Sequence, residues 1–329
     1  MVRPRHHGLA GAAAGLAMTT PQPRAVGIRL PYEQTPPAVR RWVETELGAP
    51  VVESRTSLGG MSPGCAARLR LADGRRAFVK AVGADLNPVT PTLFRHEIEV
   101  LDHLDPAPYR PGVVATYDDG SWVALLLEDI EGRHPDLSSA SVADAVWRTV
   151  AAQTEELTPP PRGLRVLRLS ESVMRWCESW SGLAADPGRC LPDWATQDFD
   201  RLRDLVTRLP DRLPVETLCH WDVRDDNLLV RADGSVMIFD WGMARLGPRW
   251  ADLFALCLEW AETPDFDQRI ARTAADPVTV TDLLLGLGGH LAFGATQPAP
   301  PGLPTLPAFR RREAARFLAG AWRRLQTNG

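Results

Sequence analysis

The segment from Leu218 to Gly242 constrains the fold and the chemistry of this chain more than any other stretch. Its polar residues His220, Asp222 and Asn227 have the spacing H-x-D-x-x-x-x-N, and Asp240 follows later in the segment. Two apolar runs with an Ala-Asp-Gly turn between them separate Asn227 from Asp240, a pattern that predicts a β-hairpin. A hairpin brings its two ends together, so we expect the loop with Asp222 and Asn227 to lie beside Asp240. The predicted strands are Leu228–Val230 and Val236–Phe239.

Carboxylate and amide oxygens at one sheet edge are typical ligands of Mg²⁺. We assign Asn227 and Asp240 to such a metal site, which leaves Asp222 as a spare carboxylate. Phosphoryl transfer needs this combination, because a metal ion binds the phosphates while a carboxylate orients the attacking hydroxyl and accepts its proton. Arg224 lies two residues past Asp222, where a guanidinium can stabilise the negative charge of the transferred group. The catalytic candidates are Asp222 and Arg224; the simpler alternative is a hairpin with ordinary turn acids.

These residues resemble the catalytic motif of the aminoglycoside phosphotransferase family, within the wider protein-kinase-like and choline-kinase-like fold. The resemblance extends over nearly the whole chain after residue 25, but only its motifs are specific to the family. It implies an α+β, bilobal protein-kinase-like fold. The small lobe is expected to have a five-stranded antiparallel sheet plus a helix, and the large, mainly helical lobe to carry the catalytic hairpin. Trp221 stands where a small residue is usual and Arg224 where histidine is frequent, which weakens the aminoglycoside assignment more than the kinase chemistry.

The predicted organisation has three parts. Residues 1–24 are rich in Ala and Gly and are expected to form a disordered N-terminal extension. Residues 25–130 form the N-terminal nucleotide-binding lobe, and residues 131–329 form the C-terminal catalytic and substrate-binding lobe. The proline-rich patches at 159–161 and 298–307 are interpreted as loops within the large lobe and not as domain linkers.

A glycine-rich loop lies between the first two predicted strands of the small lobe. Gly59 and Gly60 lack side chains, so backbone N–H groups can approach phosphates closely, and Ser62 adds a hydroxyl. No Gly-Lys-Ser follows, which excludes a Walker A loop, and an ordinary turn remains the alternative. The five predicted strands are Val51–Leu58, Ala66–Leu71, Ala77–Val82, Val113–Tyr117 and Trp122–Leu127.

Lys80 lies on the third predicted strand between apolar neighbours, so its ammonium needs a partner. The helix that begins near Thr90, expected to be its cap, supplies two candidates. At about 100° per residue, Glu97 falls on the apolar stripe and Glu99 falls on the opposite side. We therefore pair Glu97 with Lys80, in the arrangement that kinase-like enzymes use to bind the α- and β-phosphates. The stripe comprises Phe94, Ile98, Leu101 and Leu104.

The residues after the fifth predicted strand are identified through the resemblance alone. They correspond to the hinge between the lobes, where backbone groups of Glu128 and Ile130 would meet the adenine edge. In the large lobe, Ser141 and Asp144 predict a capping box for a helix that ends near Leu157. Further helices are expected at Ser170–Trp180, Asp193–Leu209 and Leu253–Trp260, with a helix pair across 283–318.

Two residues of the catalytic region are assigned structural roles. His220 is flanked by Cys219 and Trp221, and we expect it to hold the loop by packing and hydrogen bonding, because kinase-like schemes use the aspartate as base. Asp252 is placed to cap the helix that follows it, and the resemblance implies that it supports the catalytic loop.

Composition excludes several classes of protein. The 329 residues are 44% hydrophobic and 24% charged, which is the normal globular range. The net charge of −4 argues against a broad nucleic-acid interface. The five cysteines are scattered and odd in number, which fits free thiols in a cytoplasmic protein. No apolar run has a membrane-spanning length, and no membrane or protein partner is implied.

The function that follows is an ATP-dependent phosphotransferase that uses Mg²⁺ and moves the γ-phosphate to a hydroxyl of a small molecule. The expected acceptor is an aminoglycoside or related antibiotic, then a macrolide, then a metabolite such as choline, homoserine or a sugar. An acidic segment suits a cationic acceptor, but a solvated helix end is the favoured explanation, because charge runs usually are solvated. A catalytically silent nucleotide-binding module is the alternative, and a protein kinase would need Asp-Phe-Gly and Ala-Pro-Glu motifs that the chain lacks. The acids are Glu259, Glu262, Asp265 and Asp267.

Overall fold

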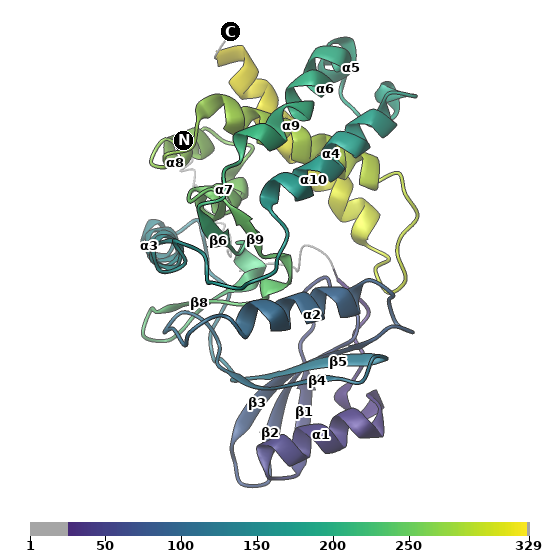
Figure 1. The fold of residues 1–329 in the computed structure, drawn as a ribbon, viewed down its shortest axis with the longest axis vertical. Coiled ribbons are helices and arrows are strands. Elements are labelled where there is room, and N and C mark those ends of the chain that lie inside the picture. Colours follow the sequence, from purple (N-terminus) through teal and green to yellow (C-terminus); the bar gives the residue numbers. More distant parts are fainter. Residues whose placement is uncertain (1–25, 328–329) are drawn as a thin grey trace, which may run out of the picture.

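The computed structural model describes residues 26–327 as two lobes, a small one with strands β1 to β5 and a large one with most of the helices (Figure 1). The predicted α+β bilobal, kinase-like architecture is confirmed, with a five-stranded antiparallel sheet in the small lobe and a mainly helical large lobe that carries small hairpins. The N-terminal extension predicted for residues 1–24 lies outside the described residues. Within 26–327, no helix has both the length and the apolar character needed to cross a bilayer.

The sheet of the small lobe has the strand order β1-β2-β3-β5-β4. Helix α1, Pro37–Leu47, packs on one face and helix α2, Thr90–Leu101, packs on the other, as Figure 1 shows. Burial on both faces explains why the neighbouring inner strands β3 and β5 are rich in apolar residues. The strands are β1 Val51–Thr56, β2 Cys65–Leu71, β3 Arg76–Gly83, β4 Val113–Asp118 and β5 Trp122–Leu127.

Alternation along β3 aims one charged side chain at α2. Val79 and Ala81 belong to the cluster under α1, whereas Val82 packs with Phe94 of α2 on the other face. Because side chains alternate across a strand, Lys80 shares the face of Val82 and points toward α2.

The start of α2 differs from the prediction. Thr90 is the first residue of the helix and does not cap it. The N-cap residue is Val89, which has no capping side chain, and Asn87 lies just before it. Asn87 Oδ1 accepts hydrogen bonds from the backbone N–H groups of Val89 and Thr90, both at 2.9 Å. The Thr90 hydroxyl also donates to Asn87 Oδ1, at 3.0 Å, so it is bound to Asn87 and does not cap the helix.

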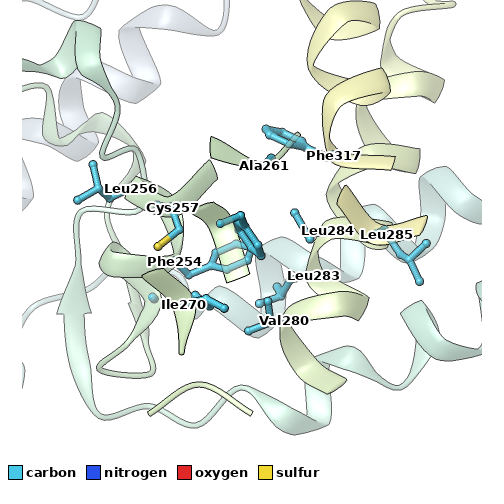
Figure 2. Close-up of a cluster of buried hydrophobic side chains, with 14 of the residues drawn as sticks. Phe254, Leu256, Cys257, Ala261, Ile270, Val280, Leu283, Leu284, Leu285 and Phe317 are labelled. Carbon is cyan, nitrogen blue, oxygen red and sulfur yellow. The ribbon is translucent and has the colours of Figure 1, made fainter. Parts of the chain in front are cut away.

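The large lobe is built around a core of helices α4, α7, α9 and α10, part of which Figure 2 shows around Phe254, Leu284 and Phe317. Two predicted features are wrong: Ser141 does not cap α3, whose N-cap is Ser139, and the predicted helix 193–209 is broken at Asp198. The helices are α3 Ala140–Glu156, α4 Leu169–Leu183, α5 Asp193–Gln197, α6 Phe199–Thr207, α7 Ala251–Cys257, α8 Asp265–Ile270, α9 Pro277–Gly294 and α10 Leu306–Thr327.

The predicted hairpin is present. Strands β7, Leu228–Val230, and β8, Val236–Ile238, pair in antiparallel register, with Leu228 opposite Ile238. A second small pair, β6 Thr217–Cys219 with β9 Arg245–Gly247, brackets this hairpin. The two pairs hold the segments before and after the hairpin side by side.

The proline-rich loop between α9 and α10 crosses from the large lobe to the small lobe (Figure 1). Asn87 Nδ2 donates to the carbonyl of Pro301 at 2.7 Å, and the N–H of Ile28 donates to the carbonyl of Gly302 at 2.8 Å. Met61, at the tip of the glycine loop, packs on Leu306 and Phe309 at the start of α10. We call this loop, residues 295–305, the interlobe strap.

Gly289 allows close packing of α4 on α9. A Cβ atom at this position would lie 2.3 Å from the indole of Trp180, which is fully buried. Gly289→Ala gains about 1 kcal/mol of helix propensity, but the overpacking costs about 1–3 kcal/mol. We therefore expect a net loss in the free energy of unfolding, measured by urea denaturation. Gly188→Ala is the control, because its Cβ would lie 3.9 Å from the nearest atom. Equal stability of the two variants would contradict this packing analysis.

Candidate functional site

Lys80 joins the two lobes. Its Nζ lies 2.5 Å from Oε2 of Glu97 on α2 and 3.0 Å from Oδ1 of Asp240, just after the hairpin. The predicted pairing of Lys80 with Glu97 is therefore present. Burial lowers the pKa of Lys80, but the charges of Asp240 and Glu97 outweigh it and leave the pKa raised. The ammonium is thus held in its charged form inside the protein.

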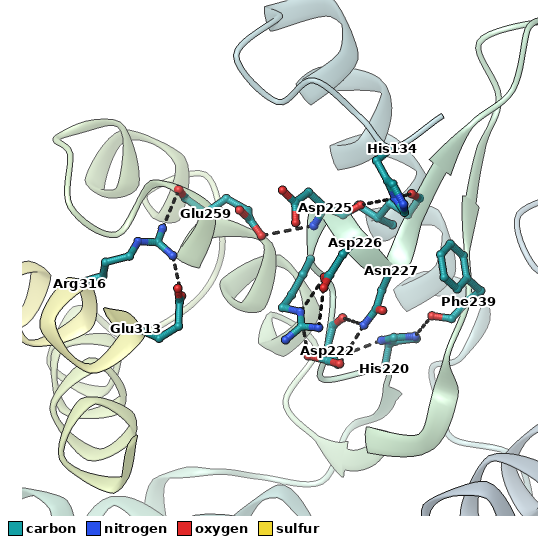
Figure 3. Close-up of polar contacts among 12 residues, drawn as sticks. His134, His220, Asp222, Asp225, Asp226, Asn227, Phe239, Glu259, Glu313 and Arg316 are labelled. Atoms are coloured by element: carbon teal, nitrogen blue, oxygen red, sulfur yellow. Dashed lines mark hydrogen bonds and ion pairs between the residues drawn. The ribbon is translucent and has the colours of Figure 1, made fainter. Parts of the chain in front are cut away.

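The loop before β7 brings Asp222 and Asn227 together. Asn227 Nδ2 donates to the backbone carbonyl of Asp222 at 2.9 Å and to its Oδ2 at 2.8 Å, as Figure 3 shows. Burial raises the pKa of Asp222 to about 6, although the charge of Arg224 opposes this rise. The Asp222 carboxylate is therefore more basic than a solvated aspartate.

Arg224 is held by two carboxylates. Its Nε and Nη2 donate to the two carboxylate oxygens of Asp226 at 2.9 and 3.0 Å. The same Nε lies 3.5 Å from Oδ1 of Asp222. The side chains of Arg224 and Asp222 therefore lie close together, as the predicted role of Arg224 beside the transferred group requires. Sequence reasoning did not find Asp226 as the partner that fixes the guanidinium.

Asp252 supports the catalytic loop from behind. Its two carboxylate oxygens accept the backbone N–H groups of His220 at 2.9 Å and Trp221 at 2.8 Å. Asp252 is the second residue of α7. Its carboxylate bonds the loop and does not cap its own helix, so the predicted cap is wrong and the predicted support is present.

Trp221 and Asp240 have φ values of 61° and 71° and are the non-glycine residues with positive φ within 26–327. Such backbone needs external support.

His220 is a structural residue, as predicted. It is fully buried, its Nε2 lies 3.0 Å from the carbonyl of Phe239, and its Nδ1 accepts the N–H of Asp222 at 3.3 Å. Burial lowers the pKa of His220, so the neutral ring donates through Nε2 and accepts through Nδ1. The ring has no nitrogen left to act as a base, and it ties the loop to the hairpin.

A cavity of about 340 Å³ lies between the lobes. Most of the predicted site residues line it, whereas Asp222 and Arg224 do not and instead bond the lining residues Asn227 and Asp226. At the hinge, Arg68 Nη2 donates to the carbonyl of Ile130 at 2.6 Å. The predicted residues that line it are Gly59, Gly60, Ser62, Lys80, Glu97, Glu128, Ile130, Asn227 and Asp240.

The donors at the floor of the cavity fit a magnesium ion that also binds phosphate. Both hydrogen bonds from Asn227 Nδ2 go to Asp222, so its amide oxygen is the group that faces a cation. Asp240 adds a carboxylate, of which Oδ1 already contacts Lys80. No group of three or more His, Cys, Asp or Glu in the described chain could hold a metal ion by itself. One carboxylate and one amide suit Mg²⁺, which takes its remaining ligands from phosphate and water.

Sequence reasoning missed Arg29 and Arg68 in the cavity wall. Arg29 precedes the first helix in a segment with no periodic pattern, so no sequence signal identified it.

The acidic segment after the hairpin is largely structural. Asp267 and Glu262 pair with arginines of α10, whereas Glu259 Oε1 accepts the N–H of Asp225 at 3.3 Å (Figure 3).

Asp252→Asn tests the support of the loop. Asparagine keeps one acceptor oxygen, so one of the two N–H groups loses its partner and the loop shifts. We expect kcat to fall by about 10- to 100-fold, while the KM for ATP changes little because Lys80 and the hinge are untouched. Steady-state kinetics against Asp204→Asn, an exposed acid of α6, provide the comparison. A kcat equal to that of the control would remove Asp252 from this role.

Comparison with known proteins agrees with the site. Residues 67–282 match the APH family, described as the phosphotransferase enzyme family. No curated protein matches the sequence. Among solved structures, aminoglycoside phosphotransferase APH(4)-Ia is 14% identical over 89% of this chain and 99% of that chain, with a TM-score of 0.59.

Two further structures extend the comparison. A thermostable APH(4)-Ia mutant in ternary complex with AMP-PNP and hygromycin B has 14% identity, coverage of 89% and 99%, and a TM-score of 0.58. Choline kinase LicA from Streptococcus pneumoniae has 16% identity, coverage of 86% and 98%, and a TM-score of 0.56. At these identities the likeness shows the fold alone. The family match spans well over half of the chain and includes Lys80 and the catalytic segment, so the protein belongs to the phosphotransferase enzyme family and is an ATP-dependent kinase of small molecules.

Proposed function

We propose that this protein moves the γ-phosphate of ATP to a hydroxyl of an aminoglycoside or related antibiotic, with Asp222 as the catalytic base. One observation carries the site assignment: Lys80 Nζ lies 3.0 Å from Oδ1 of Asp240, although 160 positions separate the two residues in sequence. This contact places the Lys80 ammonium of the small lobe next to the Asp240 carboxylate at the end of the hairpin. Phosphoryl transfer depends on such convergence, because its catalysis is mainly positioning and charge stabilisation.

The roles follow from the contacts. The acceptor hydroxyl gives its proton to the Asp222 carboxylate while its oxygen forms the new bond to phosphorus, and the bond from phosphorus to the leaving oxygen of ADP breaks. Arg224, oriented by Asp226, stabilises the charge on the transferred group. Lys80 binds the α- and β-phosphates with Glu97 as its orienting partner. Asn227 and Asp240 would hold Mg²⁺, which when bound neutralises phosphate charge.

The backbone of the hinge favours adenine as the nucleobase of the bound nucleotide. The N–H of Glu128 is bonded to the carbonyl of Gly112 at 2.8 Å, and the carbonyl of Ile130 is taken by Arg68. We assign the two other backbone groups, the Glu128 carbonyl and the Ile130 N–H, to hydrogen bonds with the nucleobase. An acceptor followed by a donor complements the amino group and ring nitrogen of adenine, whereas guanine presents the reverse order at this edge. Gly59, Gly60 and Ser62 would cover the phosphates.

A cationic acceptor is supported by the acids around the loop. Asp225 and Asp226 line the cavity on the side of Asp222, and Glu259 lies against the backbone of Asp225. Carboxylates at a site entrance attract a polycation and raise its local concentration. Choline, also cationic, is the second candidate, because LicA shares the fold.

Asp222→Asn tests the base. The variant keeps the size of the side chain and removes its basicity, so we expect kcat to fall by about 10²–10⁴-fold. The affinity for MgATP should be preserved, because Asp222 does not line the nucleotide cavity. Calorimetric titration and an ADP-release assay measure the two quantities. Asp200→Asn is the control, since its side chain is 84% exposed. Full activity in Asp222→Asn would exclude the assigned base.

The acceptor class is tested by an ADP-release screen on the wild-type enzyme. We expect turnover with at least one aminoglycoside, with phosphate found on a hydroxyl of the product by mass spectrometry and ³¹P NMR. Because the attraction is electrostatic, KM for that acceptor should rise with ionic strength. Turnover with choline and none with any aminoglycoside would move the assignment to the second candidate.

A further inference from the structure

The segment before the first helix runs along the glycine loop. The N–H of Gly27 donates to the carbonyl of Gly60 at 3.2 Å, and the N–H of Leu30 donates to that of Gly64 at 3.0 Å. In return, the N–H of Gly64 donates to the carbonyl of Ile28 at 3.1 Å. Residues 27–30 therefore act as an added strand that fixes the shape of the loop.

Arg29 lies at the centre of this contact. Its two terminal nitrogens donate to the carbonyls of Gly59 and Ser62. A Cβ atom at Gly60 would lie 2.6 Å from Nη2 of Arg29, so only glycine permits this approach. The guanidinium holds carbonyls on both sides of Gly60, which leaves the N–H groups of the loop for a ligand.

The charge of Arg29 also lies in the nucleotide cavity. Arg29 lines it together with Lys80 and Asp240. Lys80 already has two carboxylate partners, and Arg68 pairs with Asp129 near the hinge. Among the cations in the described part of the cavity wall, Arg29 is the one that forms no ion pair with a described carboxylate, and its hydrogen bonds go to neutral carbonyls.

Among residues 26–327, no carboxylate lies within ion-pair distance of the Arg29 guanidinium, although its terminal nitrogens have carbonyl partners. Its Nε is buried without a hydrogen-bond partner in the described residues. Burial lowers the pKa of Arg29, and the charge of Asp240 opposes this effect. Arginine remains charged in such surroundings, so a cation without a paired carboxylate faces the cavity.

We propose that Arg29 is a second phosphate-binding cation of this kinase, contacting the β- and γ-phosphates of the nucleotide while it holds the glycine loop. The proposal rests on the proposed function, in which this cavity takes ATP. A triphosphate brings several negative charges, and Lys80 shares its charge with Glu97 and Asp240. Arg29 supplies the missing positive charge at the loop side, and its fork of donors suits phosphate oxygens.

Arg29→Met tests the proposal, because methionine keeps an apolar stem and removes the charge and the donors. We expect the affinity for ATP and ADP to fall by about tenfold or more, the value of one charge-assisted hydrogen bond. Binding of adenosine, which has no phosphate, should change by less than about twofold. Arg29→Lys restores a charge without the fork and should recover part of the loss for ATP. Calorimetric titration of each ligand gives these values.

Arg55→Met is the matched control, since Arg55 is an exposed arginine of the neighbouring strand β1. Equal affinity of Arg29→Met and this control for ATP would overturn the proposal. An equal loss for adenosine and ATP would also overturn it, because it would mean that Arg29 acts only on the shape of the loop. If Arg29→Met does not fold, the ATP-to-adenosine affinity ratio of Arg29→Lys decides in the same way. Failure of the wild-type protein to bind MgATP would contradict the proposed function itself.

Discussion

The contact between Lys80 and Asp240 is the interaction that places the candidate site at the junction of the two lobes, beside a hydrophobic cluster that both lobes share. A buried ion pair contributes little net stability, because the desolvation of two ions offsets most of their attraction. Its effect here is positional: the ammonium can satisfy Glu97 and Asp240 together only when β3, α2 and the end of the hairpin meet at one place. The three residues that meet at this nitrogen atom, Lys80, Glu97 and Asp240, all line the cavity between the lobes.

The backbone near the catalytic loop is held in conformations that the chain would not adopt alone. Trp221 and Asp240 have left-handed φ values, and both are close to groups that compensate for them. Asp252 takes the N–H of Trp221, and the indole of Trp221 lies between Trp176 and Phe254, at ring-centroid distances of 6.4 and 6.1 Å. A large aromatic residue at this position is therefore part of the large-lobe core, which explains the departure from the usual small residue.

Features with a local periodic signal could be predicted from the sequence. The hairpin, the strand of Lys80 and the choice of Glu97 over Glu99 all follow from alternation or helical phase, and each is present. The caps were predicted less well, because the Thr90 hydroxyl bonds the Asn87 side chain instead of capping α2, a contact that spacing does not show. Arg29 left no signal at all: its position depends on backbone hydrogen bonds to a loop some thirty residues away. The roles of the site residues remain predictions.

The interlobe strap has a mechanical consequence for the catalytic cycle. The glycine loop is fastened through Met61 to the start of α10, and the segment beside it is fastened through Ile28 to Gly302. Lifting the loop away from a bound nucleotide therefore requires the strap to move with it, and with the strap the ends of α9 and α10. We expect the glycine loop, the strap and the ends of α9 and α10 to move together when ADP leaves. Residues far from the nucleotide would then influence the rate of ADP release.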